Sequence, residues 1–201
     1  MSMDGFRESS ERKRKLDLWL SLGFAGLALV VYILTISPGL YPGESASLVA
    51  AYTGLTPMEL PLRPVWGMIV SFLGSFGPFS TALNLNLFSA LCTAFSVCLI
   101  YRLANFFLYD TIDDEHMERR APYASTWGAA TAAAAFLFAA PIWQSAVRLQ
   151  HQSFDLMIAL MCASVLIRQA VRPTAAKVLL FSTLLGIGLS DSVMLDRKSV
   201  V

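Results

Sequence analysis

The chain has 201 residues, of which 56% are hydrophobic and only 14% are charged, and its mean hydropathy is +0.59. This composition excludes an ordinary soluble domain and predicts an integral membrane protein. The formal net charge is only +1, and five of the fifteen Lys and Arg residues lie in the first 15 positions, where they indicate membrane topology rather than nucleic-acid binding.

The first predicted span lies over residues 16–36 and contains an uncharged run of 19 residues, 18–36. As a helix this run would be about 28 Å long, at roughly 1.5 Å per residue, which matches the hydrocarbon core of a bilayer. It is too long for the apolar core of a typical signal peptide, and no clear cleavage site follows it. We therefore expect an uncleaved signal anchor behind a basic cytoplasmic tail, residues 1–15.

An outer loop with short helices is predicted over residues 37–78. A Pro-Gly turn signal precedes Glu44, which begins a short helix. A second short helix, partly embedded in the membrane, is expected over residues 64–76. A Gly-Pro pair follows it and interrupts an uncharged stretch that is too long for one crossing.

Four further spans complete the predicted all-α, multi-pass transmembrane domain, which covers residues 16–190 and crosses the membrane about five times. These spans are expected over 79–108, 123–143, 154–171 and 175–190. The span over 123–143 is rich in alanine, and such small side chains let neighbouring helices approach closely. The remaining tail, 191–201, suits neither a span nor a domain, and we interpret it as a fragment end or as out-of-frame sequence.

The distribution of lysine and arginine predicts the orientation, because positive residues are retained on the cytoplasmic side. With the N-terminus inside, eleven basic residues fall on the inner side and two, Arg63 and Arg148, on the outer side. The inner set is Arg7, Arg12, Lys13, Arg14, Lys15, Arg102, Arg119, Arg120, Arg168, Arg172 and Lys177. This asymmetry predicts a cytoplasmic N-terminus and an extracytoplasmic loop over 37–78.

Two interpretations of Glu44 follow from its place at the start of a short helix beside the membrane. A carboxylate there gains typically 0.3 to 1 kcal/mol from the helix dipole and the free amides, so a capping role explains it. Alternatively, the carboxylate accepts a proton from a hydroxyl group that attacks an electrophile. The second role requires cationic groups nearby for the leaving group.

Several short motifs follow one another along the chain. They are Thr35 and Pro38 in a T-x-x-P pattern, Glu44-Ser45 before the small residues Ala50 and Ala51, Pro61 and Pro64 in a proline-rich segment, an N-L-F-S-A run over residues 86–90, and Trp143, Ala146 and Val147. With these motifs, residues 30–160 resemble the opening of a bacterial family of multi-pass membrane proteins long filed as a domain of unknown function. That family is related to a vertebrate transmembrane protein O-mannosyltransferase and is of the GT-C glycosyltransferase type.

The resemblance implies transfer of a sugar from a polyprenyl-phosphate sugar to an acceptor on the outer face of a bacterial inner membrane. In such enzymes an acidic residue of the first outer loop is the base, and Glu44 occupies that position. Arg63 and Arg148 are then candidates to bind the departing phosphate, since arginine pairs bidentately with phosphate oxygens. Asn86 is a candidate substrate contact. The expected partners are the bilayer and this donor lipid, with no cofactor.

Each of the three substrate-binding candidates also has a purely structural interpretation. Arg63 can pair with Glu59 across a turn, and an exposed pair of this kind contributes about 0 to 1 kcal/mol. Arg148 can extend its guanidinium to the lipid headgroups, as arginine at a helix end commonly does. Asn86 can hydrogen-bond to a neighbouring helix, which is the usual role of a polar residue inside a membrane.

His151 and Asp155 are four residues apart, so on a helix they would share one face and could pair. The sequence offers no third ligand at a suitable spacing, and no metal site is predicted.

Departures from the family pattern support a second hypothesis. Ser47, Gln150 and Gln152 stand at or near positions where the resembled family has acidic or tyrosine side chains. A chain without these groups could be a non-catalytic or truncated membrane protein of the same fold, with a scaffold role.

Overall fold

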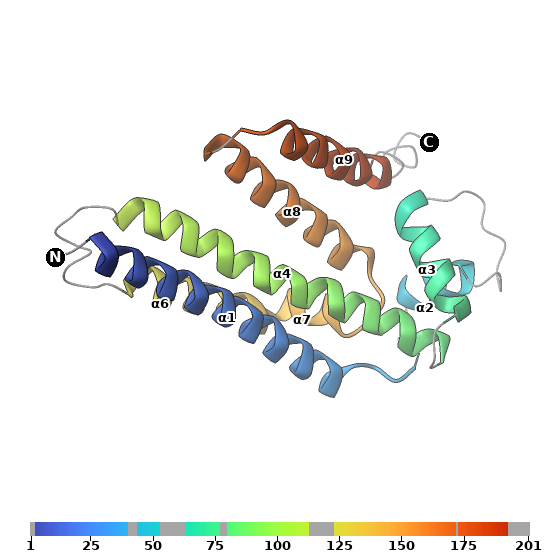
Figure 1. The fold of residues 1–201 in the computed structure, drawn as a ribbon. Coiled ribbons are helices and arrows are strands. Elements are labelled where there is room, and N and C mark those ends of the chain that lie inside the picture. Colours follow the sequence, from blue (N-terminus) through green and yellow to red (C-terminus); the bar gives the residue numbers. More distant parts are fainter. Residues whose placement is uncertain are drawn as a thin grey trace.

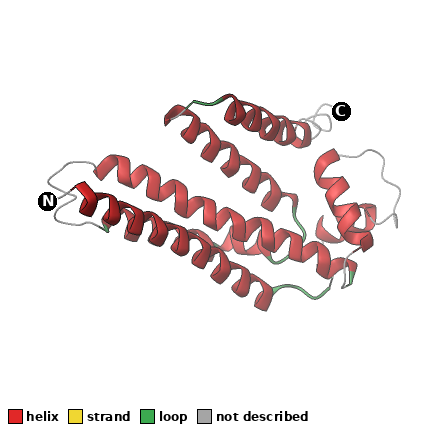
Figure 2. Cartoon of the chain, viewed as in Figure 1, coloured by secondary structure: helices red, strands yellow, loops and turns green. Residues whose placement is uncertain are grey.

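The computed structural model of the chain describes residues 3–39, 44–52, 63–76, 80–112, 123–171 and 173–192. Within these ranges every regular element is a helix (Figure 2). The helices are α1 (Met3–Thr35), α2 (Glu44–Tyr52), α3 (Pro64–Phe76), α4 (Thr81–Ile112), α6 (Ala124–Phe138), α7 (Ala140–Ala146), α8 (His151–Val171) and α9 (Ala175–Ser192). The prediction of an all-α fold is confirmed.

Helix α4 lies at the centre of the arrangement (Figure 1). Helices α1, α6 and α7 pack along it, α8 packs against it, and α9 returns along α8. The short helices α2 and α3 lie beside the first turns of α4, at the end of the bundle where α1 finishes (Figure 1). The two ends of the bundle are therefore formed by different elements, and each end carries a candidate site.

Three of the described helices are long and apolar enough to cross a membrane: α1 over Arg12–Thr35, α4 over Thr81–Tyr109, and α8. The bent pair of α6 and α7 makes a fourth if it counts as one span. Helix α9 forms over the predicted fifth span, but it is not among these, so its crossing stays a prediction. Exposed side chains such as Trp19 (71%) and Leu34 (80%) are typical of helices that face lipid.

Helix α1 begins much earlier than the span predicted over residues 16–36. The predicted basic tail contributes helical turns from Met3 onward, because Arg, Lys and Glu favour helix and neither Pro nor a second Gly follows Gly5 before residue 16. The predicted short helices are confirmed, since α2 begins at Glu44 and α3 spans Pro64–Phe76 as expected.

The span predicted over residues 123–143 consists of two helices and not of one straight helix. It is broken into α6 and α7, which meet at an angle of 63° around the extended residue Ala139. The physical reason is Pro141, which has no N–H to donate to the carbonyl of Leu137 and whose ring would clash with that group in a straight helix. The alanine-rich composition suggested one helix, and this single proline outweighs it.

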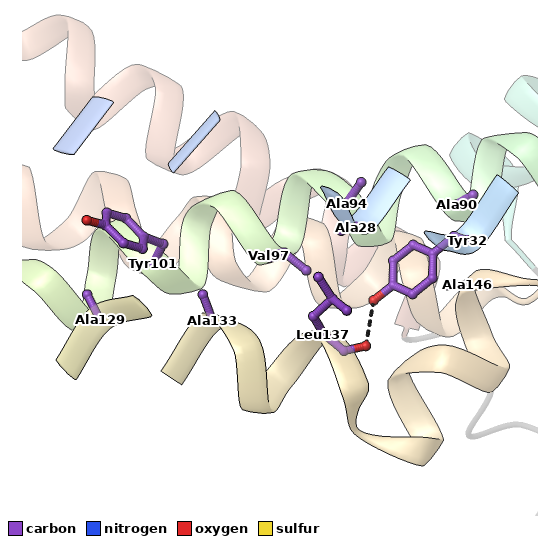
Figure 3. Packing of buried hydrophobic residues seen from close by; sticks show 10 residues of the cluster. All are labelled: Ala28, Tyr32, Ala90, Ala94, Val97, Tyr101, Ala129, Ala133, Leu137 and Ala146. Atoms are coloured by element: carbon purple, nitrogen blue, oxygen red, sulfur yellow. Dashed lines mark hydrogen bonds between the residues drawn. The ribbon is translucent and has the colours of Figure 1, made fainter. Parts of the chain in front are cut away.

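Tyr32 of α1 supplies the hydrogen bond that the break removes. Its hydroxyl donates to the Leu137 carbonyl oxygen at 3.1 Å, and both residues are fully buried (Figure 3). Small side chains such as Ala129 and Ala133 line the same cluster and let α6 approach α4 closely (Figure 3). A methyl group added at Gly128 would lie only 2.6 Å from Leu108 Cδ1. The break and the close packing thus belong to one core.

We expect Tyr32→Phe to lower the free energy of unfolding by about 1 to 3 kcal/mol, because it leaves the buried Leu137 carbonyl without a donor. The measurement is unfolding in detergent micelles, with Tyr123→Phe as the control at an exposed tyrosine. In a Pro141→Ala background residue 141 regains an N–H, so the same change at Tyr32 should destabilise less. Equal effects in both backgrounds would contradict this explanation.

Candidate functional site

All four predicted site residues belong to segments at the same end of the bundle, where α2, α3, the start of α4 and the connection from α7 to α8 lie (Figure 1). These residues are Glu44, Arg63, Asn86 and Arg148, and they come from four separate parts of the sequence. Glu44 begins α2, but its side chain lies outside the described residues. The described part of the candidate site consists of Arg63, Asn86 and Arg148, together with the contacts that hold α2 in place.

A buried apolar cluster connects these segments. Its core is Val49, Trp66, Val70, Leu85, Cys92, Leu149, Phe154, Ile158 and Leu184. Leu85 directly precedes Asn86, and Leu149 directly follows Arg148. Val49 anchors α2 on this cluster, one turn after the buried Ser45. The cluster fixes the backbone positions of the candidate residues relative to one another, which is the role of a scaffold beneath a site.

Asn86 joins two segments through both ends of its amide group. Its Nδ2 donates to the Ser37 carbonyl oxygen at 2.9 Å, and its Oδ1 accepts from the Leu149 N–H at 2.7 Å. The side chain is buried, with an exposed fraction of 3%. Asn86 therefore ties the segment after α1 to the connection before α8, and both of these partners lie outside the helices.

The other motif residues make similar contacts around Asn86. Trp143 Nε1 donates to Thr35 Oγ1 at 3.1 Å, and the Ser37 N–H donates to the Val147 carbonyl at 3.2 Å. Ser89 Oγ accepts from the Gln150 N–H at 3.3 Å. Motifs that are more than a hundred residues apart in sequence thus meet at one end of the fold.

Arg63 forms an ion pair with Asp155 of α8, while Glu59, the partner considered from the sequence, lies outside the described residues. The Arg63 Nη1 donates to Asp155 Oδ2 at 2.6 Å. The arginine side chain is 6% exposed, whereas that of Asp155 is 41% exposed, so the pair lies at an open edge of the structure. Among the described residues no group of three His, Cys, Asp or Glu side chains is placed to hold a metal ion.

Arg148 lies in the connection between α7 and α8, and its side chain is half-buried. Its Nη2 is 3.5 Å from Gln144 Oε1, which is a long contact and therefore a weak restraint. The guanidinium remains close to the end of α7 and does not extend away as a free headgroup anchor.

Sequence reasoning missed the role of Asp191. This carboxylate, 1% exposed, comes from the end of α9 and accepts from the N–H groups of Val65 and Trp66 at 3.0 and 3.1 Å. It satisfies free amides in the first turn of α3, where a negative charge also interacts favourably with the helix dipole. The signal that the sequence offers is an acidic residue directly after an apolar run, at the first position of the predicted tail.

Comparisons with known proteins give one match. A family model described as the protein O-mannosyl-transferase TMEM260 N-terminal domain matches residues 49–195. The matched range includes Arg63, Asn86 and Arg148 and begins after Glu44. No curated protein and no solved structure matches the chain.

Proposed function

The chain belongs to the protein O-mannosyl-transferase TMEM260 N-terminal domain family, and from that premise we propose that it transfers a sugar from a polyprenyl-phosphate sugar to an acceptor on the extracytoplasmic face. It is a glycosyltransferase-related membrane region by its family. The observation that carries the proposal is the apolar cluster that holds α2, Arg63 and Arg148 at one end of the helices. A catalytic base and the cations that bind the phosphate must be held in fixed positions relative to one another, and a shared apolar cluster can provide this.

In the proposed reaction an acceptor hydroxyl attacks the anomeric carbon of the donor. A new carbon–oxygen bond forms while the bond from that carbon to the phosphate oxygen breaks, with inversion at the carbon. The Glu44 carboxylate takes the hydroxyl proton. The electron pair of the broken bond stays with polyprenyl phosphate, whose increased negative charge requires fixed cationic groups.

Arg63 and Arg148 are the proposed cationic groups. The ion pair with Asp155 uses one N–H of Arg63 in the described contacts, and a guanidinium carries five such donors. Asp155 fixes the orientation of the Arg63 guanidinium. Its negative charge also offsets the positive charge of Arg63, which weakens the attraction of that guanidinium for an anion. Asn86 supports the site from below, since both ends of its amide already hold backbone groups.

The proposed location is a bacterial inner membrane with a cytoplasmic N-terminus. The described part of the chain supports this orientation. Lys13, Arg14 and Lys15 of α1 line one cavity with Arg102 of α4. The beginning of α1 and the end of α4 lie away from α2 and α3 (Figure 1). Positive residues on that side favour its retention in the cytoplasm, which leaves the candidate site outside.

The test is an assay of the protein at its natural full length in membranes, with a labelled polyprenyl-phosphate sugar as donor. We expect label to appear in a non-lipid acceptor. The matched control supplies the same labelled sugar as a nucleotide sugar, from which no transfer is expected. Transfer from the nucleotide sugar, or from neither donor, would contradict the proposal.

A non-catalytic scaffold of the same fold is the second candidate function. One observation favours it: the motif residues Thr35, Asn86, Ser89 and Trp143 all hydrogen-bond to other parts of this chain. Absence of transfer from both donors, with a folded protein, would favour this candidate.

A further inference from the structure

A basic cavity lies at the opposite end of the bundle from the candidate site. It has a volume of about 610 Å³, is lined by α1, α4 and α8, and is open on one side. Its charged lining residues are Lys13, Arg14, Lys15, Arg102 and Arg168, with Asp17 as the one carboxylate among the described lining residues. Five positive groups from three helices therefore surround one cavity.

The single carboxylate of this lining is already engaged. Asp17 Oδ1 accepts from the Tyr101 hydroxyl at 3.3 Å and from Thr126 Oγ1 at 3.2 Å. The described contacts of Asp17 are therefore with neutral hydroxyl groups, and no ion pair between Asp17 and the lining cations is among them. The lining keeps a large positive excess that an anionic ligand can offset.

Two buried polar atoms of the lining have no hydrogen-bond partner in the described part of the chain, Asn105 Oδ1 and Ser164 Oγ. Both atoms have almost no solvent-accessible surface, so a ligand in the cavity meets them only after a rotation of the side chain. Such a rotation would give each atom a partner, as buried polar atoms normally have. A serine hydroxyl can donate to a phosphate oxygen, and an amide oxygen can accept from a hydroxyl.

Apolar side chains form the rest of the wall. Leu18, Leu103, Phe106 and Ile167 line the same cavity. Helices α1 and α8 on either side have few buried residues within their apolar stretches, so both present apolar surface to lipid. A ligand that fits this wall has an anionic head and hydrocarbon chains, which favours a lipid over a small hydrophilic anion such as free phosphate.

We propose that this cavity binds the phosphate-bearing headgroup of an anionic phospholipid from the cytoplasmic leaflet, with its acyl chains along α1 and α8. Arg102 and Arg168 hold the phosphate from two helices, and Ser164 Oγ donates to it. Asn105 Oδ1 accepts a hydroxyl group of the headgroup. The site is separate from the proposed transferase site and does not depend on that activity.

The test compares ligands on the purified full-length protein in neutral detergent, by native mass spectrometry and by the melting temperature. The three probes are phosphatidylglycerol, phosphatidylcholine and inorganic phosphate. We expect retained binding and a raised melting temperature with phosphatidylglycerol alone. Equal effects of phosphatidylcholine would refute recognition of negative charge, and equal effects of inorganic phosphate would refute a lipid ligand.

Arginine variants then locate the site. Arg102→Gln and Arg168→Gln are each expected to weaken phosphatidylglycerol binding about fivefold or more, since each basic residue near an anionic surface contributes about that factor. Both side chains are exposed, so the variants should fold. The matched control is Arg12→Gln, which removes an exposed arginine of α1 outside the lining. An equal loss in this control would show diffuse attraction and overturn the proposal.

Discussion

Glu44→Gln should lower the initial rate of sugar transfer by about two to four orders of magnitude, the contribution typical of a general base. Glutamine has nearly the same shape but cannot take the proton of the acceptor hydroxyl. The measurement is the initial rate with saturating polyprenyl-phosphate sugar, at equal amounts of membrane-inserted protein. Undiminished transfer by this variant would contradict the role of Glu44, although the wild-type protein would still be a transferase.

Glu44→Asp is the matched variant, because it keeps a carboxylate at this position on a side chain that is one methylene shorter. We expect its rate to lie clearly above that of the glutamine variant, within about a hundredfold of wild type, since it displaces the base by about 1 Å. A loss of capping at α2 changes stability by about 1 kcal/mol and cannot explain a large rate difference. Equal melting temperatures of the two variants would exclude misfolding as the cause.

Asn86→Leu should destabilise the fold more than any other single substitution considered, by about 2 to 4 kcal/mol. Leucine has a similar size but leaves the Leu149 N–H, in a fully buried residue, without its acceptor. It also removes the donor to the Ser37 carbonyl, so the segment after α1 loses its tie to α4. The measurement is the free energy of unfolding in detergent micelles.

Thr131→Val serves as the control for Asn86→Leu. Thr131 is exposed, and its hydroxyl donates only to the Trp127 carbonyl of its own helix at 3.0 Å. We expect a change within about 0.5 kcal/mol, as for a surface position. If the two variants lost equal stability, the two amide contacts of Asn86 would not be the reason.

Local signals determined much of the helical fold. Proline in a first turn and a Gly-Pro pair after the last turn predicted α3, and Glu44 after a turn predicted the start of α2. The break at Ala139 has its cause in the sequence, at Pro141, although the alanines on either side favour helix. Helix α1 extends into the predicted tail because charged residues such as Arg, Lys and Glu also favour helix.

The candidate site could be predicted only in part. Its residue types follow from chemistry, since arginine suits phosphate and a carboxylate suits a base. The partners do not, because Arg63 pairs with a residue 92 positions away, and Asp191 reaches α3 across more than 120 positions. Periodicity and propensity describe neighbours along the chain, and they carry no information on such contacts.

The sequence by itself determined a helical membrane protein with one end rich in basic residues, because composition and charge distribution are properties of the chain alone. The tertiary structure decided which partner each of these polar side chains contacts. It placed Asn86 between two backbone segments, engaged Arg63 with Asp155, and brought Arg102 and Arg168 to one cavity with the basic turn of α1. Such pairings depend on which helices pack together, and in a membrane this packing depends on the fit of side chains and on hydrogen bonds between helices that are far apart in the sequence.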